Sequence, residues 1–431
     1  MKARALILFC CTLLVSCAVQ LHVCGASEDA AIFPDVPPLP TGRACTSFLL
    51  DADDHPLFGT NRDSYRGRGL VYINKRGVQK RGLKAGTTGA YARWTSRYGS
   101  VTFNNIGPEY PWSGMNEAGL AISTMYLRGT EMPAPDPRPP VVTAQWLQYQ
   151  LDNCSTVKEV IASAAQIRIA PGMVDHHLVC DRTSSCAVIE FLDGEPVIYT
   201  GETAPVRALT NSAYAQALAS WERAPRLILD ESLRRFSRVA DLVHGYGSSV
   251  GSPLAYAFGI LADVGYVRRS AWSIVYDLQA LHVYFRTREN GHVRCLDLNA
   301  FDMSCTTPIK TLDVDADLSG DVSEAFADTV PGAGLALFWA FCRAERLGLT
   351  YAEARDEVAY LEGFPCAVPD AQPAHDDAGR PRSVSCAADM PPGIDDIPLR
   401  GGMGAYAPLL GALLVTIVVA YVAYRTNRRR R

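Results

Sequence analysis

The sequence predicts a layered α+β domain in which two sheets are covered by helices. Strand-like runs dominate the first part of the domain, helix-like runs occupy residues 144–164 and 214–243, and strand-like runs return from Trp272 onward. Asn290-Gly291 stands between two of these later runs, and this pair is a strong signal for a β-hairpin. An apolar run near the C-terminus adds a single transmembrane helix to the predicted architecture.

The individual elements follow from residue patterns along the chain. Apolar residues recur at helix-like spacings within residues 144–164, with an interruption at Asn153-Cys154-Ser155. Residues 332–349 and 351–361 are predicted as two further helices. The predicted strands are 43–50, 58–63, 70–74, 100–104, 120–125, 177–180, 187–191, 196–199, 272–277, 282–287 and 293–298.

The first predicted hairpin carries the candidate nucleophile, Cys45. If the bond between Ala44 and Cys45 is cut, the freed α-amino group has an unperturbed pKa of roughly 7.7–8.0 and can take the thiol proton of the same residue. Asp63 ends the second strand of the hairpin, so its carboxylate would hold the charged amine. For a lone cysteine before a strand, the simpler alternative is a disulfide half or a buried thiol.

The N-terminal segment fits a secreted precursor. Lys2 and Arg4 precede an apolar run that ends in small residues, so residues 1–26 are predicted as a signal peptide. A lipid-attachment motif ending at Cys17 is an alternative. The proline-rich residues 27–44 are predicted as a pro-segment that masks the amine of Cys45, with a disordered mature N-terminus as the alternative.

The cysteine content agrees with an oxidising compartment. Of 13 cysteines, those in the predicted signal peptide are lost, and eight remain besides Cys45, enough for four disulfides. Local pairs are plausible, although the sequence does not fix their connectivity, and none of the spacings fits zinc. The local pairs considered are Cys180 with Cys186, Cys295 with Cys305, and Cys366 with Cys386.

The C-terminal part of the chain predicts a membrane tether. Beyond a catalytic domain at residues 45–330, residues 331–365 form a helical extension and residues 366–404 a proline- and aspartate-rich linker or stalk. Residues 405–424 are long and apolar enough to span a bilayer, and the basic residues 425–431 place the tail in the cytoplasm. The catalytic domain would then be extracellular or lumenal; a cleaved lipid-anchor signal and a buried core helix are the disfavoured alternatives.

Six motifs in order along the chain carry a resemblance to a known family. The motifs are Cys45-Thr46 with Gly59-Thr60-Asn61-Arg62-Asp63, residues 112–123, Leu209-Thr210-Asn211-Ser212, residues 235–240, residues 273–278 and Tyr284-Phe285-Arg286-Thr287. Together they resemble the choloylglycine hydrolase family of linear-amide C–N hydrolases, which includes penicillin V acylases and conjugated bile salt hydrolases, and the resemblance extends from Cys45 to about Val322. It implies a four-layer αββα Ntn-hydrolase fold and cleavage of an amide through an acyl-enzyme.

The resemblance also implies roles for individual residues. Cys45 is similar to the family nucleophile, and Asp63 to the residue that holds its amine. Asn211 resembles the side-chain donor to the oxyanion, and Arg235 the active-site arginine that stabilises the intermediate or orients Cys45. Tyr126 stands where penicillin V acylases have tyrosine, and it would supply a backbone donor and a pocket wall. Without the resemblance, Asn211 is equally well explained as a turn asparagine. Arg235 is then better explained as a residue on a solvated helix face.

One position departs from the family pattern. Many members have arginine where this chain has Thr60, and that arginine lies beside the nucleophile. Arg62 is two positions further on, so it shares a face with Thr60 if the segment is a regular strand. Either another arginine such as Arg235 supplies the charge, or the site is electrostatically weaker.

The predicted function is that of a self-processing N-terminal-cysteine hydrolase that cleaves a linear N-acyl amide through a thioester. Tyr126 favours penicillin V or other aryl and fatty-acyl amides over conjugated bile salts. The alternative from another class is an inactive cell-surface binding protein on the same scaffold. No metal or organic cofactor is required, and the net charge of −4 gives no reason to expect nucleic acid. The expected partners are the small-molecule substrate and the membrane, and homo-oligomerisation is left open.

Two further motifs receive structural interpretations. His176-His177 at the start of a predicted strand is read as a buried, hydrogen-bonded pair in preference to a catalytic one. The aspartates from Asp313 to Asp321, with Glu324, resemble a calcium loop, but Leu318 replaces the glycine that the loop requires, so a solvated turn is preferred.

Overall fold

The computed structural model describes residues 44–52, 55–82, 91–224, 227–247, 251–265, 270–367 and 385–399. The predicted signal peptide, nearly all of the predicted pro-segment, the predicted membrane helix at 405–424 and the basic tail at 425–431 lie outside these residues. Among the helices that the structure describes, none is both long and apolar enough to cross a membrane.

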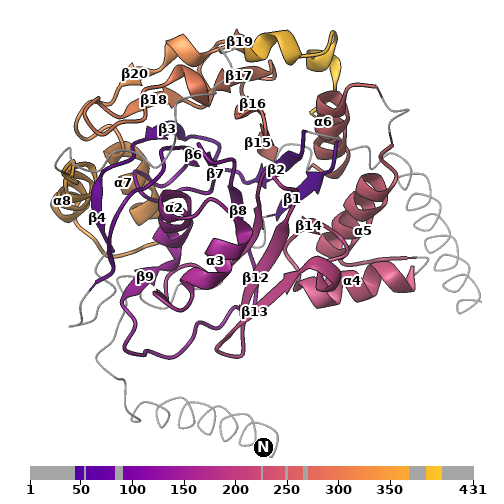
Figure 1. Cartoon of the computed structure of the whole chain (residues 1–431), viewed down its shortest axis with the longest axis horizontal. Coiled ribbons are helices and arrows are strands. Elements are labelled where there is room, and N and C mark those ends of the chain that lie inside the picture. The colour runs from indigo at the N-terminus through magenta and orange to yellow at the C-terminus, as the bar shows by residue number, and fades with distance from the viewer. Residues whose placement is uncertain are drawn as a thin grey trace, which may run out of the picture.

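Two large sheets form the centre of the domain (Figure 1). The first contains β1 (Ala44–Leu50), β2 (Leu57–Asp63), β14 (Ala208–Leu209), β15 (Ser270–Asp277), β16 (His282–Thr287), β17 (Arg294–Asp297) and β19 (Gly320–Asp321), in the order β14-β1-β2-β15-β16-β17-β19. The second contains β3 (Leu70–Asn74), β6 (Ser100–Asn104), β7 (Ser113–Asn116), β8 (Ala121–Tyr126), β11 (Asp175–Cys180), β12 (Cys186–Leu192), β13 (Glu195–Thr200), β18 (Lys310–Asp313) and β20 (Ala327–Asp328), in the order β13-β12-β11-β8-β7-β6-β3-β18-β20. Two short pairs complete the strands: β4 (Gln79–Arg81) with β5 (Arg93–Thr95), and β9 (Pro140–Val142) with β10 (Arg168–Ala170).

Helices cover the outer faces of both sheets. Of α4 (Tyr214–Arg223), α5 (Glu231–His244) and α6 (Pro253–Val264), α5 contacts β1 and β14, while α6 contacts β2 and β15. On the other sheet, α2 (Thr143–Asn153) contacts β7 and β8, and α3 (Val157–Ser163) follows it. Because β1 also contacts β8 and β11 of the facing sheet, the layers run helix, sheet, sheet, helix. The predicted αββα architecture is confirmed.

The space between the sheets is filled by aromatic side chains. Phe103 of β6 contacts Phe285 of β16 at a ring distance of 5.3 Å and Tyr276 of β15 at 6.2 Å. All three rings are fully or almost fully buried. Burying each such side chain stabilises the fold by about 1.5–3 kcal/mol, so this inter-sheet core holds the two sheets face to face.

The predicted helical run at 214–243 is wrong as a single element. Ala224 ends α4 in the left-handed region at φ 43°, and Asp230 begins α5 by accepting a hydrogen bond from Leu233 N. A left-handed residue and a new N-cap cannot lie inside one helix, so the run divides in two. The helix α6 was not predicted; its N-cap Ser252 and the proline in its first turn are the signals that identify it.

The helical extension forms a pair of packed helices, α7 (Leu335–Ala344) and α8 (Tyr351–Glu362). They lie on the side of the domain away from α4, α5 and α6 (Figure 1). Thr350 and Glu353 form a capping box that begins α8. Residues 385–399, within the predicted linker, pack against the first sheet, where Arg286 donates to the backbone oxygens of Ile397 and Pro398.

The disulfides correct two of the three local pairings. Cys180–Cys186 is present, as predicted, and joins facing residues of β11 and β12. The other two disulfides are Cys295–Cys386 and Cys305–Cys366, so the predicted Cys295–Cys305 and Cys366–Cys386 pairs are wrong. Both observed disulfides attach C-terminal segments of the chain to the domain. The spacing of cysteines in the sequence does not predict such long-range pairs. Cys45, Cys154 and Cys342 are buried free thiols.

We predict that the long-range disulfide stabilises the fold more than the hairpin disulfide does. Cys295 and Cys386 are 91 residues apart, whereas Cys180 and Cys186 are 6 apart. Loop-closure entropy grows with the logarithm of this separation, so replacing the long-range pair with alanine should lower the free energy of unfolding by about 2 kcal/mol more. Urea titration of the two double-alanine variants measures this difference, and equal losses would contradict it.

Candidate active site

The pairing of β1 with β2 places the predicted nucleophile between two charged residues. Cys45 lies opposite Arg62, and Ala44 lies opposite Asp63. On the other side of β2, Ser270 of β15 donates a hydrogen bond from Oγ to Asp63 Oδ1. Cys45 is 5% exposed and Asp63 is fully buried. The hairpin therefore brings the two residues together at the end of the strands, as the sequence predicted.

Asn211 connects the backbone nitrogen of Cys45 to Tyr126. Cys45 N–H donates to Asn211 Oδ1 at 2.7 Å, and Asn211 Nδ2 donates to the backbone oxygen of Tyr126 at 2.8 Å. Asn211 follows β14, which pairs with β1, and its own N–H donates to Ser232 Oγ at 2.9 Å. The amide is thus oriented at both ends. Its role as oxyanion donor stays a prediction: one N–H of Nδ2 is donated to Tyr126, and the oxyanion would take the other.

Arg235 reaches the same cluster from α5. Its Nη1 donates to the backbone oxygen of Cys45 and to Thr46 Oγ1 at 2.6 Å, and its Nη2 donates to Asn211 Oδ1 at 2.9 Å. Glu231, one turn earlier, accepts from Arg235 Nε at 2.6 Å and fixes the guanidinium. Arg235 is 5% exposed and precedes Phe236, which is in the core, so the solvated-helix alternative is wrong.

The thiol of Cys45 is strongly protonated while Ala44 is attached. Burial raises the pKa of the Cys45 thiol to about 11, and the Asp63 carboxylate adds to the increase. The cations Arg62 and Arg235 lower this pKa, but by less. At pH 7 a pKa near 11 leaves on the order of one thiol in ten thousand ionised, so the uncleaved chain needs a base to become nucleophilic.

Thr60, which stands where many family members have arginine, makes uncharged contacts, and other residues supply the positive charge. Thr60 Oγ1 shares hydrogen bonds with Ser47 Oγ at 2.7 Å and Ser123 Oγ at 3.0 Å, which joins β1 and β2 to β8 by uncharged contacts. Arg62 instead lies in the pocket with Cys45, with its guanidinium 4.8 Å from the ring centre of Trp272. Together with Arg235, it supplies positive charge close to the thiol.

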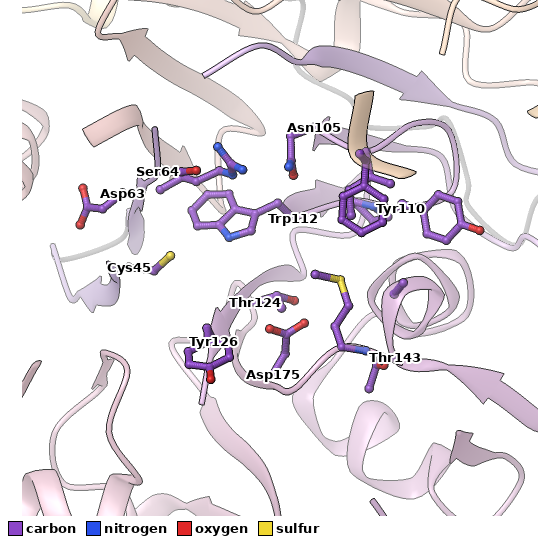
Figure 2. Close-up of a pocket in the computed structure, with 16 residues that line it drawn as sticks. Cys45, Asp63, Ser64, Asn105, Tyr110, Trp112, Thr124, Tyr126, Thr143 and Asp175 are labelled. Atoms are coloured by element: carbon purple, nitrogen blue, oxygen red, sulfur yellow. Dashed lines mark hydrogen bonds between the residues drawn. The ribbon is translucent and has the colours of Figure 1, made fainter. Parts of the chain in front are cut away.

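A cavity of about 60 Å³ lies beside Cys45, and the sulfur points toward it (Figure 2). Figure 2 shows Cys45 and Tyr110 at opposite ends, with Trp112, Thr124 and Asp175 between them. This volume is well below the roughly 300–1,000 Å³ of typical ligand pockets. The aromatic lining residues are Tyr110, Trp112, Tyr126 and Phe341, and the charged ones are Arg62, Asp63 and Asp175.

Sequence reasoning missed several residues of this pocket, and Asp175 and Phe341 are two of them. Asp175 begins β11 opposite Tyr126 and is 5% exposed, with its carboxylate directed into the cavity (Figure 2). A carboxylate next to the predicted histidine strand was the only signal for it. Phe341 comes from α7, which is remote from Cys45 in sequence, so no local pattern could have identified it.

The histidine pair is buried and hydrogen-bonded, as predicted. His176 contacts Glu190 Oε1 at 2.8 Å and the backbone oxygen of Thr210 at 2.7 Å. His177 Nδ1 contacts the hydroxyl of Thr124, a pocket residue, at 3.0 Å, and its ring stacks on Trp146. Burial lowers the pKa of His177 to about 3, so the ring is neutral.

Within the described residues, one group of metal-ligating side chains lies close enough together to be considered, Cys295, Asp321 and Cys386. Two of the three are joined in a disulfide, which removes their thiolates as ligands. This group therefore does not form a metal centre.

Comparisons with known proteins identify similar sequences and structures. Residues 85–276 match the family model for acyl-coenzyme A:6-aminopenicillanic acid acyl-transferase. Penicillin V acylase from Pectobacterium atrosepticum is 26% identical, over 51% of this chain and 72% of that protein.

Two solved structures share the fold. Penicillin V acylase from Agrobacterium tumefaciens has a TM-score of 0.57 and 24% identity, covering 67% of this chain and 98% of that one. An arginine-to-leucine variant of conjugated bile acid hydrolase from Clostridium perfringens has a TM-score of 0.54 and 20% identity, covering 64% and 98%. The chain is therefore similar to penicillin V acylase in sequence, and to penicillin V acylase and conjugated bile acid hydrolase in fold; these relatives are hydrolases of linear-amide carbon–nitrogen bonds.

Proposed function

We propose that the enzyme is an N-terminal-cysteine hydrolase that frees its own Cys45 amine and then cleaves an N-acyl amide through a thioester. One observation carries this proposal: the nitrogen that would become the amine already lies 2.7 Å from Asn211 Oδ1. Asp63 lies across the hairpin and supplies a carboxylate for the charged form of that amine. An acceptor and a counter-charge are therefore in place before the bond is cut.

Cleavage would convert a weak nucleophile into an active one. The Cys45 thiol has a pKa of about 11 in the uncleaved chain, so it holds its proton at neutral pH. A free α-amine has an unperturbed pKa of roughly 7.7–8.0 and is a competent base on the same residue. Release of Ala44 thus supplies the base that the buried thiol lacks.

The reaction then proceeds in two halves. The amine takes the thiol proton, the sulfur attacks the acyl carbonyl carbon, and the resulting oxyanion is held by Asn211 Nδ2 and a backbone N–H near Tyr126. The C–N bond breaks as the ammonium returns the proton to the leaving amine, which leaves a thioester on Cys45. Water, deprotonated by the same amine, attacks the thioester and releases the carboxylic acid with regeneration of the thiol.

The pocket favours a flat or compact acyl group. Tyr110, Trp112 and Tyr126 line the cavity, and their rings offer stacking faces to an aryl group. We therefore place penicillin V and other aryl or fatty-acyl amides ahead of conjugated bile salts. The two named relatives, a penicillin V acylase and a conjugated bile acid hydrolase, act on substrates of these two kinds.

An inactive binding protein was the rival interpretation because Thr60 replaces an active-site arginine. Arg62 and Arg235 both lower the pKa of the Cys45 thiol, so positive charge is retained at the site despite Thr60. We therefore do not favour the rival.

We also propose that the enzyme is secreted and tethered to a membrane. This rests on the sequence of residues 1–26 and 405–431. The disulfides Cys180–Cys186, Cys295–Cys386 and Cys305–Cys366 support folding in an oxidising compartment.

The first prediction concerns the N-terminal residue of the secreted protein. We expect the mature chain to begin at Cys45, and we expect Cys45→Ala to retain upstream residues and to hydrolyse no N-acyl amide. Intact mass and N-terminal sequencing measure the first point, and a panel of N-acyl amides the second. Cys154→Ala, which removes a buried thiol outside the pocket, is the matched control and should be processed and active. A folded, secreted protein that begins near Ser27 and is inactive would refute self-processing.

The second prediction separates the two functions of the Asn211 amide. Asn211→Ala should lower kcat by about 10²–10³-fold, because a preorganised donor to the oxyanion is lost. Asn211→Asp keeps an oxygen for the Cys45 amine but removes the Nδ2 donor, so it should lose a similar amount. Steady-state kinetics on the processed variants test this, with Ser212→Ala as control because Ser212 Oγ donates only to Ser232 Oγ. Full activity of Asn211→Asp would exclude the donor role.

The third prediction concerns Arg62 as the source of charge near the thiol. Arg62→Gln should raise the pKa of Cys45, whereas Arg62→Lys should leave it nearly unchanged, since this cation lowers that pKa. One pKa unit corresponds to about a tenfold lower alkylation rate at fixed pH below the pKa. Alkylation of Cys45 by a small thiol reagent, followed by mass spectrometry across pH, measures the shift. The exposed Arg68→Gln is the charge-matched control, and an equal effect there would assign the change to overall charge.

A further inference from the structure

The helix α7 borders the end of the pocket farthest from Cys45. Phe341 of α7 lines the same cavity as Cys45. In Figure 2, Tyr110 lies at the end opposite Cys45, and Phe338 of α7 stacks on Tyr110 with ring centres 5.8 Å apart and planes 10° apart. Phe341 of α7 therefore lines the cavity, and Phe338, one turn earlier, packs on the ring of Tyr110.

The pair α7–α8 is fixed firmly enough to act as a wall. Phe338 and Phe341 share an apolar cluster with Ile106 and Tyr110 of the catalytic domain. The disulfide Cys305–Cys366 attaches the chain just after α8 to the domain. A side chain held in this way does not move aside without breaking several contacts.

A second connection joins α7 to the segment that carries Arg62. Glu345 follows α7 and is 8% exposed, and its Oε1 accepts from Arg66 Nη1 at 2.9 Å. The backbone oxygen of Arg66 in turn accepts from Arg62 Nη1. Helix α7 and Arg62, the cation beside Cys45, are thus linked through the hydrogen bonds of Arg66.

This wall lies outside the matched part of the family. The family model ends at residue 276, and α7 begins at Leu335. Penicillin V acylase from Agrobacterium tumefaciens is covered over 98% of its length by 67% of this chain, so about a third of this chain has no counterpart there. The segment that the family model matches therefore does not include α7.

We propose that Phe341 is a specificity-determining residue that closes the far end of the acyl pocket and limits the length of the acyl group that reaches Cys45. The proposal rests on the proposed function. The aromatic lining fits the apolar acyl half of the substrate, while the more polar leaving amine remains on the solvent side. The substrate class is then the shorter or flatter acyl groups among the aryl and fatty-acyl amides proposed above.

The experiment compares Phe341→Ala with the wild type on N-acyl p-nitroanilides whose straight acyl chains run from acetyl to dodecanoyl. Removing the ring should move the optimum to longer chains and raise kcat/KM by about fourfold for each extra methylene group that becomes buried. Phe341→Trp should move the optimum to shorter chains. Trp339→Ala is the matched control on α7, because Trp339 packs edge to face against Tyr351 and does not line the pocket.

A second measurement keeps the result independent of amide hydrolysis. Thiol-reactive acyl halomethyl ketones of the same chain lengths are incubated with the full chain, and labelling of Cys45 is followed by intact mass. The length dependence should shift in Phe341→Ala as it does for the anilides. Two outcomes would overturn the proposal for Phe341 while leaving the proposed hydrolase function in place. One is hydrolysis by the wild type with the same chain-length optimum in Phe341→Ala, and the other is an equal shift of that optimum in Trp339→Ala. Labelling that depends on length without hydrolysis of any amide would overturn the proposed function and leave the wall supported.

Discussion

The amide of Asn211 is the contact on which the candidate active site depends. It accepts from the backbone nitrogen of Cys45 and from Arg235 through one oxygen, and it donates to the backbone of Tyr126 through its nitrogen. Polar groups in a nearly buried site are costly unless each has a partner, so this network permits few other arrangements. Through it the start of β1, the end of β8 and the helix α5 share one geometry, and the nucleophile is held before any substrate arrives.

The need of buried polar groups for hydrogen-bond partners also explains how the site accommodates Thr60. A threonine hydroxyl can satisfy Ser47 and Ser123 across the two sheets, which an arginine at that position would not do without bringing a charge between them. The cation lies two residues later, at Arg62, on the same face of β2, where it rests on the ring of Trp272. Charge near the thiol is therefore kept while the contact between β1, β2 and β8 becomes neutral.

Much of the fold could be predicted because its signals are local. The strands at 70–74, 100–104 and 282–287 were predicted with the bounds that the structure gives, since alternation and turn residues define them. The adjacency of Cys45 and Asp63 also followed from one hairpin. The division of the 214–243 run was missed because Ala224 adopts a left-handed conformation, which is rare for alanine and is not predicted by amino-acid composition.

The rest of the site depends on contacts between distant parts of the chain. The partners of Cys295 and Cys305 are 91 and 61 residues away, and local spacing gave different pairs. Asn211 and Arg235 could be named only through family resemblance, because a turn asparagine and a helix arginine have ordinary solvated interpretations. Phe341 had neither a local pattern nor a family position, and only the packing of α7 on Tyr110 identifies it.

Burial of Cys45 makes its thiol a weaker nucleophile, and cleavage before Cys45 would offset this by supplying a base. A thiol buried beside a carboxylate, with a pKa of about 11, is almost wholly protonated at neutral pH, and the two arginines offset this only in part. Exposing the thiol to lower its pKa would open the pocket and remove the apolar contacts that hold the acyl group. An amine on the same residue avoids the conflict, because it brings a base into a closed pocket without requiring a further side chain. The nitrogen that must become this base is already hydrogen-bonded to Asn211, so activation requires a bond to break but no rearrangement of the site.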